Sequence, residues 1–281
     1  MRLVTWNIQA GKGCDGVIDL ARIVAVARSL AADADIFCFQ EVSDGFEAVS
    51  GASDQGAELA ALLPDHRAVF GPAVEAIDRN GRSCRFGNMT LSRLPVRQVA
   101  GHLLPWPRTG VKRSMRRIAL EVTVQASFGP IRIVNTHLEF HSAVQREAQV
   151  ARLLDLQQEA SESPLVGSGP EHVEPFGSQI ATASSVLCGD FNFDVTDPLH
   201  RLLHRSARPG LNYRDAWHIR HPDRRHSPTC GIHDHVQWPN GPDCRDFVFV
   251  TEDLADRVCR VEVDGATAAS DHQPVLVEMA D

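Results

Sequence analysis

The sequence of 281 residues lacks several features that would assign it to a class at once. No stretch approaches the ~18 consecutive apolar residues that a membrane-spanning helix requires. Aromatic residues make up only 6% of the chain, and there is a single tyrosine. The first residues, MRLVTWNIQ, contain neither the charged nor the apolar segment of a signal peptide. We therefore expect a cytoplasmic protein with no membrane span.

An excess of positive charge is absent as well. The chain has 28 lysine and arginine residues against 36 aspartate and glutamate residues, so its formal net charge is −8. This balance argues against a protein that is held to nucleic acid by general surface charge, although it is compatible with a local basic groove. The seven cysteines are odd in number and lack paired close spacing, which indicates reduced thiols rather than a disulfide framework.

Strand and helix patterns interleave along the chain. Alternation over residues 2–8 predicts a strand, and the apolar run Ile36–Phe39 predicts a strand buried on both faces. Apolar residues at helical spacing predict a helix over roughly 17–31, which Asp15 would cap. Further helices are expected over 54–63 and from Ser142 to about Ala160, and further strands around 68–70, 87–92, 118–124, 131–136, 186–188, 247–250 and 275–277. This order predicts a single α/β or α+β domain over residues 1–281.

Two segments stand apart from this pattern. Residues 161–183 are rich in serine, glycine, proline and glutamate and contain no lysine or arginine, which predicts a flexible surface insertion. Residues 199–226 are rich in arginine and histidine and are expected to be irregular or helical.

Polar residues that could act in catalysis or bind a metal lie at the ends of the predicted strands. In a mixed sheet, the start of an antiparallel strand lies at the same edge as the end of a parallel one, so these residues are expected to converge on one rim. Singly, each has an ordinary explanation, such as a helix cap, an Asx-turn or a core histidine. Their number and shared position favour a site. They are Asn7, Gln40-Glu41, Asn135-Thr136-His137, Gly189-Asp190-Phe191-Asn192, Asp246 and Ser270-Asp271-His272.

In this order, the motifs resemble those of the endonuclease/exonuclease/phosphatase superfamily, which has the deoxyribonuclease I-like fold. The resemblance also includes Thr5-Trp6-Asn7-Ile8, Arg245-Asp246-Phe247 and the strand Gly87–Arg93, and it spans essentially the whole chain. It implies a four-layered sandwich in which two mixed β-sheets pack together between outer helices. The active site is then expected at one end of the sheets.

Hydrolysis of a phosphate ester requires an activated water, a neutralised phosphoryl group and a stabilised leaving oxyanion. A hard divalent cation with oxygen ligands, Mg²⁺ or Mn²⁺, meets the last two needs. Glu41 is expected to be the first ligand of this metal, and Asn7 lies beside it directly or through water. The resemblance places Asp271 in the same ligand shell.

The remaining site residues are assigned to the phosphate and the water. His137 and His272 are expected to face the phosphate, and by the family pattern Asp246 supports His272. Asp190 is the expected general base for the attacking water. If the backbone is extended there, Asn192 points the same way and orients the phosphate. No motif presents a serine or cysteine nucleophile, so we expect no covalent intermediate.

Two further clusters are open to more than one interpretation. The segment Arg108–Arg117 holds five basic residues, and it is either a solvated loop or a substrate-phosphate contact in which Arg116 or Arg117 enters the site. The set Cys230, His233, His235 and Cys244 offers thiolate and imidazole ligands for zinc, but its spacing fits no standard closed site.

The sequence therefore predicts a metal-dependent phosphoesterase that cleaves phosphodiester bonds, of nuclease type. The alternative is a phosphatase or phosphodiesterase that acts on a small molecule or a lipid headgroup, because this fold serves several substrate classes. A non-catalytic binding module on the same fold is least favoured, because Glu41, Asp190 and His272 are all present. The expected partner is a phosphate-ester substrate, with nucleic acid as one candidate, and no protein partner is evident.

Overall fold

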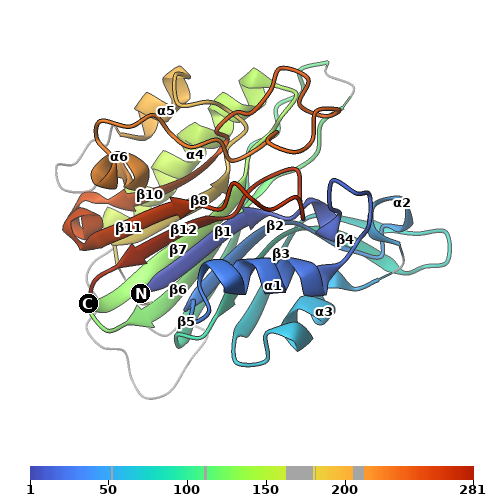
Figure 1. The fold of residues 1–281 in the computed structure, drawn as a ribbon, viewed down its shortest axis with the longest axis horizontal. Helices are drawn as coiled ribbons and strands as arrows, with labels where there is room; N and C mark the ends of the chain where they lie inside the picture. Colours follow the sequence, from blue (N-terminus) through green and yellow to red (C-terminus); the bar gives the residue numbers. More distant parts are fainter. Residues whose placement is uncertain (52, 111–112, 163–179, 181, 205–211) are drawn as a thin grey trace.

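Two six-stranded sheets pack face to face with helices outside them, as Figure 1 shows. This computed structural model describes residues 1–281 except 52, 111–112, 163–179, 181 and 205–211. The first sheet has the order β11-β12-β1-β2-β4-β3. Its strands are β1 (Arg2–Asn7), β2 (Ile36–Asp44), β3 (Arg67–Ile77), β4 (Ser83–Ser92), β11 (Val258–Val263) and β12 (Val275–Met279).

The second sheet has the order β5-β6-β7-β8-β10-β9. Its strands are β5 (Val96–Leu103), β6 (Ile118–Ala126), β7 (Gly129–His137), β8 (Ser185–Asp190), β9 (Tyr213–Asp215) and β10 (Asp246–Thr251). The α-helices are α1 (Leu20–Leu30), α2 (Glu47–Ser50), α3 (Gln55–Leu62), α4 (Ala143–Glu162), α5 (Pro198–Leu203) and α6 (Ala216–Arg220). Two 3₁₀ segments, η1 (Gln9–Gly11) and η2 (Glu252–Arg257), complete the described elements.

Three apolar layers hold the sandwich together. Between the sheets lies a core of aliphatic residues that includes Leu3, Val122 and Val248. The outer face of the first sheet packs against α1 and α3, and that of the second sheet packs against α4 and α5. The predicted four-layered sandwich with two mixed sheets is therefore confirmed. None of the described helices is both long and apolar enough to cross a membrane.

All of the predicted strands and helices are present, but three strands and the short helix α2 were not predicted, and one predicted helix cap was wrong. The strands β5, β9 and β11 were not predicted; β5 and β11 lie at sheet edges, where half-exposed residues weaken the apolar pattern. The cap of α1 is Asp19, which accepts a hydrogen bond from the backbone N–H of Arg22, so the prediction of Asp15 was wrong. Asp15 instead closes a turn before the helix and pairs with Arg22. The predicted insertion at 161–183 falls mostly outside the described residues.

A layer of buried amides joins the two sheets directly beneath the strand ends. The side-chain amide of Gln40 in β2 donates to Asn135 Oδ1 in β7 at 2.8 Å. Asn135 Nδ2 in turn donates to the Met89 carbonyl at 3.0 Å, and Asn88 Nδ2 donates to the carbonyls of Ile118 and Asn135. Since buried polar groups cost free energy unless they are paired, this layer fixes how one sheet sits on the other.

A second buried polar cluster lies beneath α4. Arg132 in β7 donates to Glu121 in β6 at 2.7 Å and to Gln157 of α4 at 2.9 Å. The His102 ring lies 3.6 Å from the same Glu121 oxygen. Although burial opposes the charged form, His102 and Arg132 outweigh it and lower the pKa of Glu121 to about 2.

Replacing Glu121 with glutamine is expected to lower stability most at neutral pH. The change leaves the Arg132 guanidinium without its charged partner, at a cost of about 3 kcal/mol. Because the folded-state pKa lies below the ordinary value of 4.5, the stabilisation by Glu121 is complete above pH 4.5 and fades as pH falls toward about 2. Urea denaturation should therefore show a difference in the free energy of unfolding between wild type and Glu121→Gln, and this difference should become smaller as pH falls over this range. Exposed Glu147→Gln is the control, and a pH-independent gap would contradict the assignment.

Candidate active site

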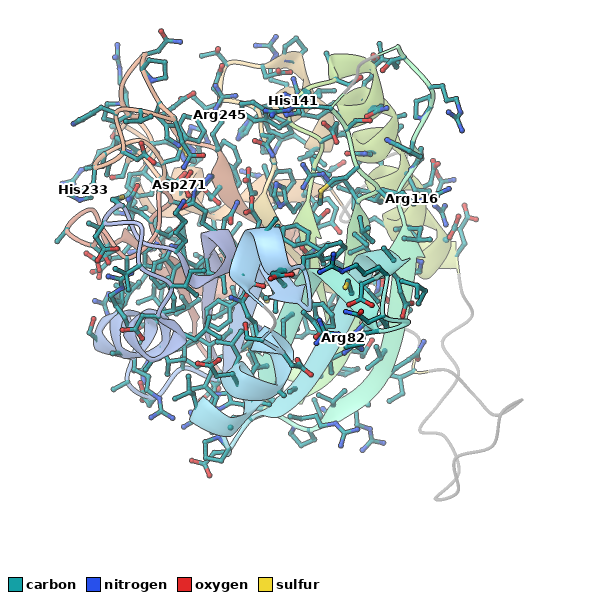
Figure 2. All side chains as sticks on the ribbon, turned by 90° about the vertical axis from the view of Figure 1, so that its right-hand side faces the viewer. Arg82, Arg116, His141, His233, Arg245 and Asp271 are labelled. Carbon is teal, nitrogen blue, oxygen red and sulfur yellow. The ribbon has the colours of Figure 1, made fainter. Side chains whose placement is uncertain are left out.

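The predicted strand-end residues converge on one rim. In the parallel pair β1–β2, Asn7 lies opposite Gln40. In the parallel pair β7–β8, His137 lies opposite Asp190, and Asp246 at the start of antiparallel β10 lies opposite Asp190 from the other side. The rule that relates the ends of parallel strands to the starts of antiparallel ones therefore holds here. The rim lies at the end of the sheets that faces the viewer in Figure 2.

A bulge in β2 separates the roles of two adjacent residues. The pairing of β2 with β4 shifts between Phe39 and Val42, and Glu41 has a left-handed backbone with φ of 60°. Gln40 consequently points into the amide layer between the sheets. Glu41 points to the rim, where Asn7 Nδ2 donates to its Oε1 at 3.1 Å.

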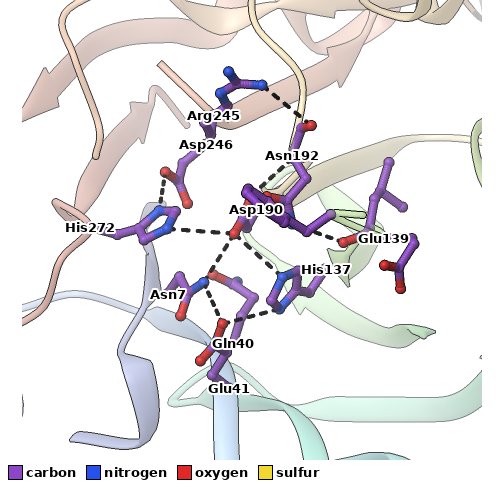
Figure 3. A network of polar contacts seen from close by, with 12 residues as sticks. Asn7, Gln40, Glu41, His137, Glu139, Asp190, Asn192, Arg245, Asp246 and His272 are labelled. Carbon is purple, nitrogen blue, oxygen red and sulfur yellow. Dashed lines mark hydrogen bonds and ion pairs between the residues drawn. The ribbon is translucent and has the colours of Figure 1, made fainter. Parts of the chain in front are cut away.

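Asp190 occupies the centre of the polar network drawn in Figure 3. Its Oδ2 accepts a hydrogen bond from Asn7 Nδ2 at 3.0 Å and lies 3.4 Å from His137 Nε2 and 3.7 Å from His272 Nε2. The other oxygen, Oδ1, accepts the backbone N–H of Asn192 at 2.9 Å. Burial raises the pKa of Asp190 to about 6, although these donors and the charge of His272 oppose that rise.

His272 is locked into place by its own carboxylate and by the first strand. Its Nδ1 lies 2.8 Å from Asp246 Oδ2, and its carbonyl accepts the indole N–H of Trp6 at 2.9 Å. Burial alone would favour the neutral ring, but the carboxylates of Asp246 and Asp190 overcome it and raise the pKa of His272 well above its ordinary value. The ring is therefore held as the charged imidazolium.

The pKa of His137 is shifted in the direction opposite to that of His272. Its ring is buried, and its Nδ1 is 4.0 Å from Glu41 Oε1. Burial, together with the positive charges of Arg117 and His272, lowers the pKa of His137 well below its ordinary value. The site thus holds one neutral and one charged imidazole, both against Asp190 Oδ2.

Glu41 and Asp271 form the acidic edge of the site. Burial and the nearby carboxylate of Asp271 raise the pKa of Glu41, which Asn7 partly offsets. Asp271 accepts the indole N–H of Trp238 at 3.2 Å and the hydroxyl of Ser270 at 3.3 Å. Within the described part of the chain, Glu41 Oε2 makes no hydrogen bond. Asn7 turns its amide nitrogen toward Glu41 and Asp190, while its oxygen accepts the N–H of Gln9.

Asn192 does not extend beside Asp190, so that expectation was wrong. Its backbone is left-handed, with φ of 53°, and its amide nitrogen donates to the Leu138 carbonyl at 2.9 Å. The turn begins at Gly189, where a Cβ would lie only 1.8 Å from the Thr136 carbonyl oxygen. The Gly189–Asn192 motif is therefore a tight turn that aims Asp190 into the rim and ties Asn192 to the end of β7.

The two candidate arginines, Arg116 and Arg117, lie in different environments. Arg117 is buried, its Nε lies 3.5 Å from Glu139 Oε2, and its charge acts on Glu41 and Asp190. Arg116 is exposed and stacks over the Trp106 ring at 5.3 Å, on the outer part of the rim in Figure 2.

The suggested zinc set of two cysteines and two histidines does not assemble. His233 Nε2 lies 3.0 Å from the Gly265 carbonyl oxygen, and Cys230 Sγ contacts the Asp243 carbonyl. In the described residues, no three of the ligand atoms of Cys230, His233, His235 and Cys244 lie within 4.8 Å of one another.

Sequence reasoning missed three residues that contact this network. The Thr229 hydroxyl donates to Asp246 Oδ2 at 2.7 Å and accepts the backbone N–H groups of Arg245 and Asp246, each at 3.0 Å. Glu139 pairs with Arg117, and Trp238 contacts both Asp271 and the edge of the His272 ring. All three lie in or next to irregular segments, where no periodicity reveals which way a side chain points.

Comparison with known proteins agrees with this geometry. The sequence matches the model of the Endonuclease/Exonuclease/phosphatase family over residues 4–272. The chain belongs to this family. The family comprises hydrolases of phosphate ester bonds, and the chain is a hydrolase of this class.

Solved structures show the same fold. An endonuclease/exonuclease/phosphatase from Beutenbergia cavernae is 26% identical with a TM-score of 0.69, and the match covers 100% of this chain and 72% of that one. The catalytic domain of human nocturnin, solved with bound sulfate, is 18% identical with a TM-score of 0.64 and coverages of 100% and 93%. A mannosyl-6-phosphatase from Bacteroides thetaiotaomicron is 17% identical with a TM-score of 0.67 and full coverage of both chains. No curated protein matches the chain.

Thr229→Val is expected to lower the free energy of unfolding by about 2 kcal/mol, because the backbone N–H groups of Arg245 and Asp246 lose their acceptor. It also frees the Asp246 carboxylate that orients His272. Thr229→Ser keeps the hydroxyl and should restore most of the stability in urea denaturation. Unchanged stability in Thr229→Val, or a loss in Thr229→Ser as large as that in Thr229→Val, would contradict the role given to the hydroxyl.

Proposed function

We propose that the protein is a divalent-metal-dependent phosphoesterase that cleaves phosphodiester bonds by direct attack of water, in the manner of a nuclease. The observation that carries the proposal is the convergence on Asp190 Oδ2 of Asn7, His137 and His272, with Glu41 and Asp271 at the edge. This arrangement provides a proton acceptor, a fixed positive charge and an acidic cation site within one rim.

The donor set fits a hard cation beside Glu41. Carboxylate oxygens of Glu41 and Asp271 are the ligands that Mg²⁺ and Mn²⁺ prefer, and burial together with the charge of Asp271 raises the pKa of Glu41. Asp190, Asp246 and His272 also lie within 4.8 Å of one another, but a charged imidazolium disfavours a cation between them. A bound cation would neutralise phosphoryl oxygens and stabilise the leaving oxyanion. Asn7 supports this site by donating a hydrogen bond to Glu41 Oε1, and it would lie beside the cation directly or through a bound water.

Asp190 is proposed as the general base. With a pKa near 6, its carboxylate is a stronger proton acceptor than an ordinary aspartate and still ionises at neutral pH. The N–H of Asn192 holds one of its oxygens, so the other is presented to the rim. The water proton moves to this oxygen as the water attacks phosphorus.

The two histidines are proposed to divide the recognition of the phosphate. His272, charged through Asp246, donates from Nε2 to a non-bridging oxygen and stabilises the negative charge of the transition state. His137, neutral, contributes a hydrogen bond without adding charge. Arg117 adds a buried positive charge behind them, whereas Arg116 reaches only the outer rim.

Aromatic side chains at the rim support a nucleic-acid substrate. The rings of Trp238 and His272 pack in a T-shaped arrangement with their centroids 5.6 Å apart. The ring of Phe140, which is 51% exposed, has its centroid 6.5 Å from that of Trp238. The exposed ring of Phe140 beside the phosphate site provides a stacking surface for bases. The second candidate is a small phosphate ester, because the net charge of −8 disfavours binding of a long duplex.

Asp190→Asn and His272→Ala are expected to reduce metal-dependent hydrolysis by at least about 100-fold, the usual scale for loss of acid–base catalysis. Thermal unfolding should change little in Asp190→Asn, which preserves shape. The matched controls are Asp223→Asn and His235→Ala, on exposed residues that are not part of the network, and they should keep full activity. Activity that survives either active-site change would overturn the roles given to these residues.

The substrate class can be decided with a single panel. Bis-p-nitrophenyl phosphate, p-nitrophenyl phosphate, plasmid DNA, RNA and sphingomyelin would be tested with Mg²⁺ or Mn²⁺ and with EDTA. We expect cleavage of the diester and of a nucleic acid, abolished by EDTA. Cleavage of the monoester alone would favour the small-molecule alternative, and activity in EDTA would refute metal dependence.

A further inference from the structure

A second cluster of ionisable side chains lies away from the phosphate site, around Asp215. One carboxylate oxygen, Asp215 Oδ2, faces three imidazole nitrogens: His200 Nε2 at 2.9 Å, His218 Nδ1 at 3.1 Å and His226 Nε2 at 2.8 Å. All four atoms lie within 4.8 Å of one another. The residues come from α5, from the junction of β9 and α6, from α6 itself and from the segment after it, which lie together in Figure 1.

Hydrogen bonding alone explains this arrangement poorly. A carboxylate oxygen offers about two lone pairs, yet three ring nitrogens approach Oδ2. The other oxygen, Oδ1, is already occupied as the cap of α6, where it accepts the N–H of Trp217. Three imidazole nitrogens and one carboxylate oxygen that lie this close together offer the kinds of ligand that bind a zinc ion.

We propose that His200, Asp215, His218 and His226 bind a structural Zn²⁺ ion. Zinc bonds of ~2.0–2.1 Å in a tetrahedron place the ligand atoms roughly 3.3 Å apart, close to the distances between Asp215 Oδ2 and the three nitrogens. Nitrogen-rich ligation by imidazoles suits zinc better than Mg²⁺, which prefers oxygen ligands. With four protein ligands the site is closed, as structural zinc sites are.

The surroundings of the cluster fit a buried, structural ion. His200 and Asp215 are buried, and the ring of Phe247 contacts both His200 and His226. The second nitrogen of His226 lies 3.5 Å from Cys244 Sγ, which is a contact of the kind that orients a metal-bound imidazole. His218, whose side chain is 46% exposed, gives an ion access from solvent.

The site also has a consequence for the phosphate centre. His226 precedes Thr229 by three residues, and Thr229 donates to Asp246, which orients His272. A small cavity lined by Asp215, His226, Thr229 and Asp246 separates the two clusters. An ion bound at Asp215 would therefore anchor the segment that supplies Thr229, and it would do so without contacting the substrate.

The experiment measures zinc on the full chain purified without a histidine tag. Metal analysis after dialysis should find one zinc ion per chain, and a competing chelator should give its affinity. His218→Ala, a change at an exposed side chain, should weaken zinc binding by at least about tenfold, since even outer-shell changes cost ~10- to 100-fold. His226→Gln is the second variant. Added zinc should raise the melting temperature of wild type but not of these variants.

Two controls locate the ion. His235→Ala removes a member of the alternative cysteine–histidine set, and Asp190→Asn alters the phosphate centre; both should retain zinc as wild type does. Cobalt(II) in place of zinc should give the visible spectrum of a tetrahedral site in wild type and in both controls. Absence of zinc from wild type, undiminished binding by His218→Ala, or loss of zinc in either control would overturn the proposal.

Discussion

The structure of this site depends on how a buried carboxylate is compensated. Asp190 is almost fully buried, and an isolated charge in that position would cost several kcal/mol. Its partners come from both sheets: Asn7 from the first, His137 from the second, and His272 from the segment before β12. Because no single element supplies enough of them, the charge can be accommodated only if the sheets are in the correct relation. Assembly of the site therefore requires both sheets to be in their native relation.

The amide layer beneath the rim makes that relation specific. Apolar packing between two sheets tolerates small sliding movements, since aliphatic contacts are not directional. The bonds from Gln40 to Asn135, and from Asn88 to carbonyls of β6 and β7, are directional and would be broken by a shift of one residue. The bulge at Glu41 uses the same fixed frame, because it turns one residue to the rim while its neighbour remains in the layer. The positions of the side chains at the phosphate site thus depend on polar contacts that lie beneath the rim and do not contact the substrate.

The sequence predicted those parts of the molecule that repeat a period or a motif. Apolar runs indicated the buried strands, and the geometry of mixed sheets predicted that the polar residues at their ends would lie together. Side-chain direction in irregular segments could not be predicted, because it depends on tertiary partners. Hence adjacent Arg116 and Arg117 looked equivalent, although one stacks on Trp106 and the other is buried against Glu139. Asn192 was expected to be extended, but the turn after Gly189 gives it a left-handed backbone. The histidines around Asp215 were visible only as a composition bias, since their spacing matches no standard motif.

The protonation states of His137 and His272 at the phosphate site follow from the charged groups that lie next to each ring. Two histidines face one aspartate oxygen, yet His272 has a carboxylate behind it and His137 has an arginine charge nearby. The pKa values of the two rings consequently move in opposite directions, although both rings are buried. If both were charged, the site would repel a cation at Glu41; if both were neutral, Asp190 and Asp246 would lack a counter-charge. One charged ring and one neutral ring is the arrangement that leaves the edge at Glu41 and Asp271 acidic while the centre remains balanced. The position of a carboxylate behind a ring, rather than the identity of the ring, therefore decides which histidine serves which purpose.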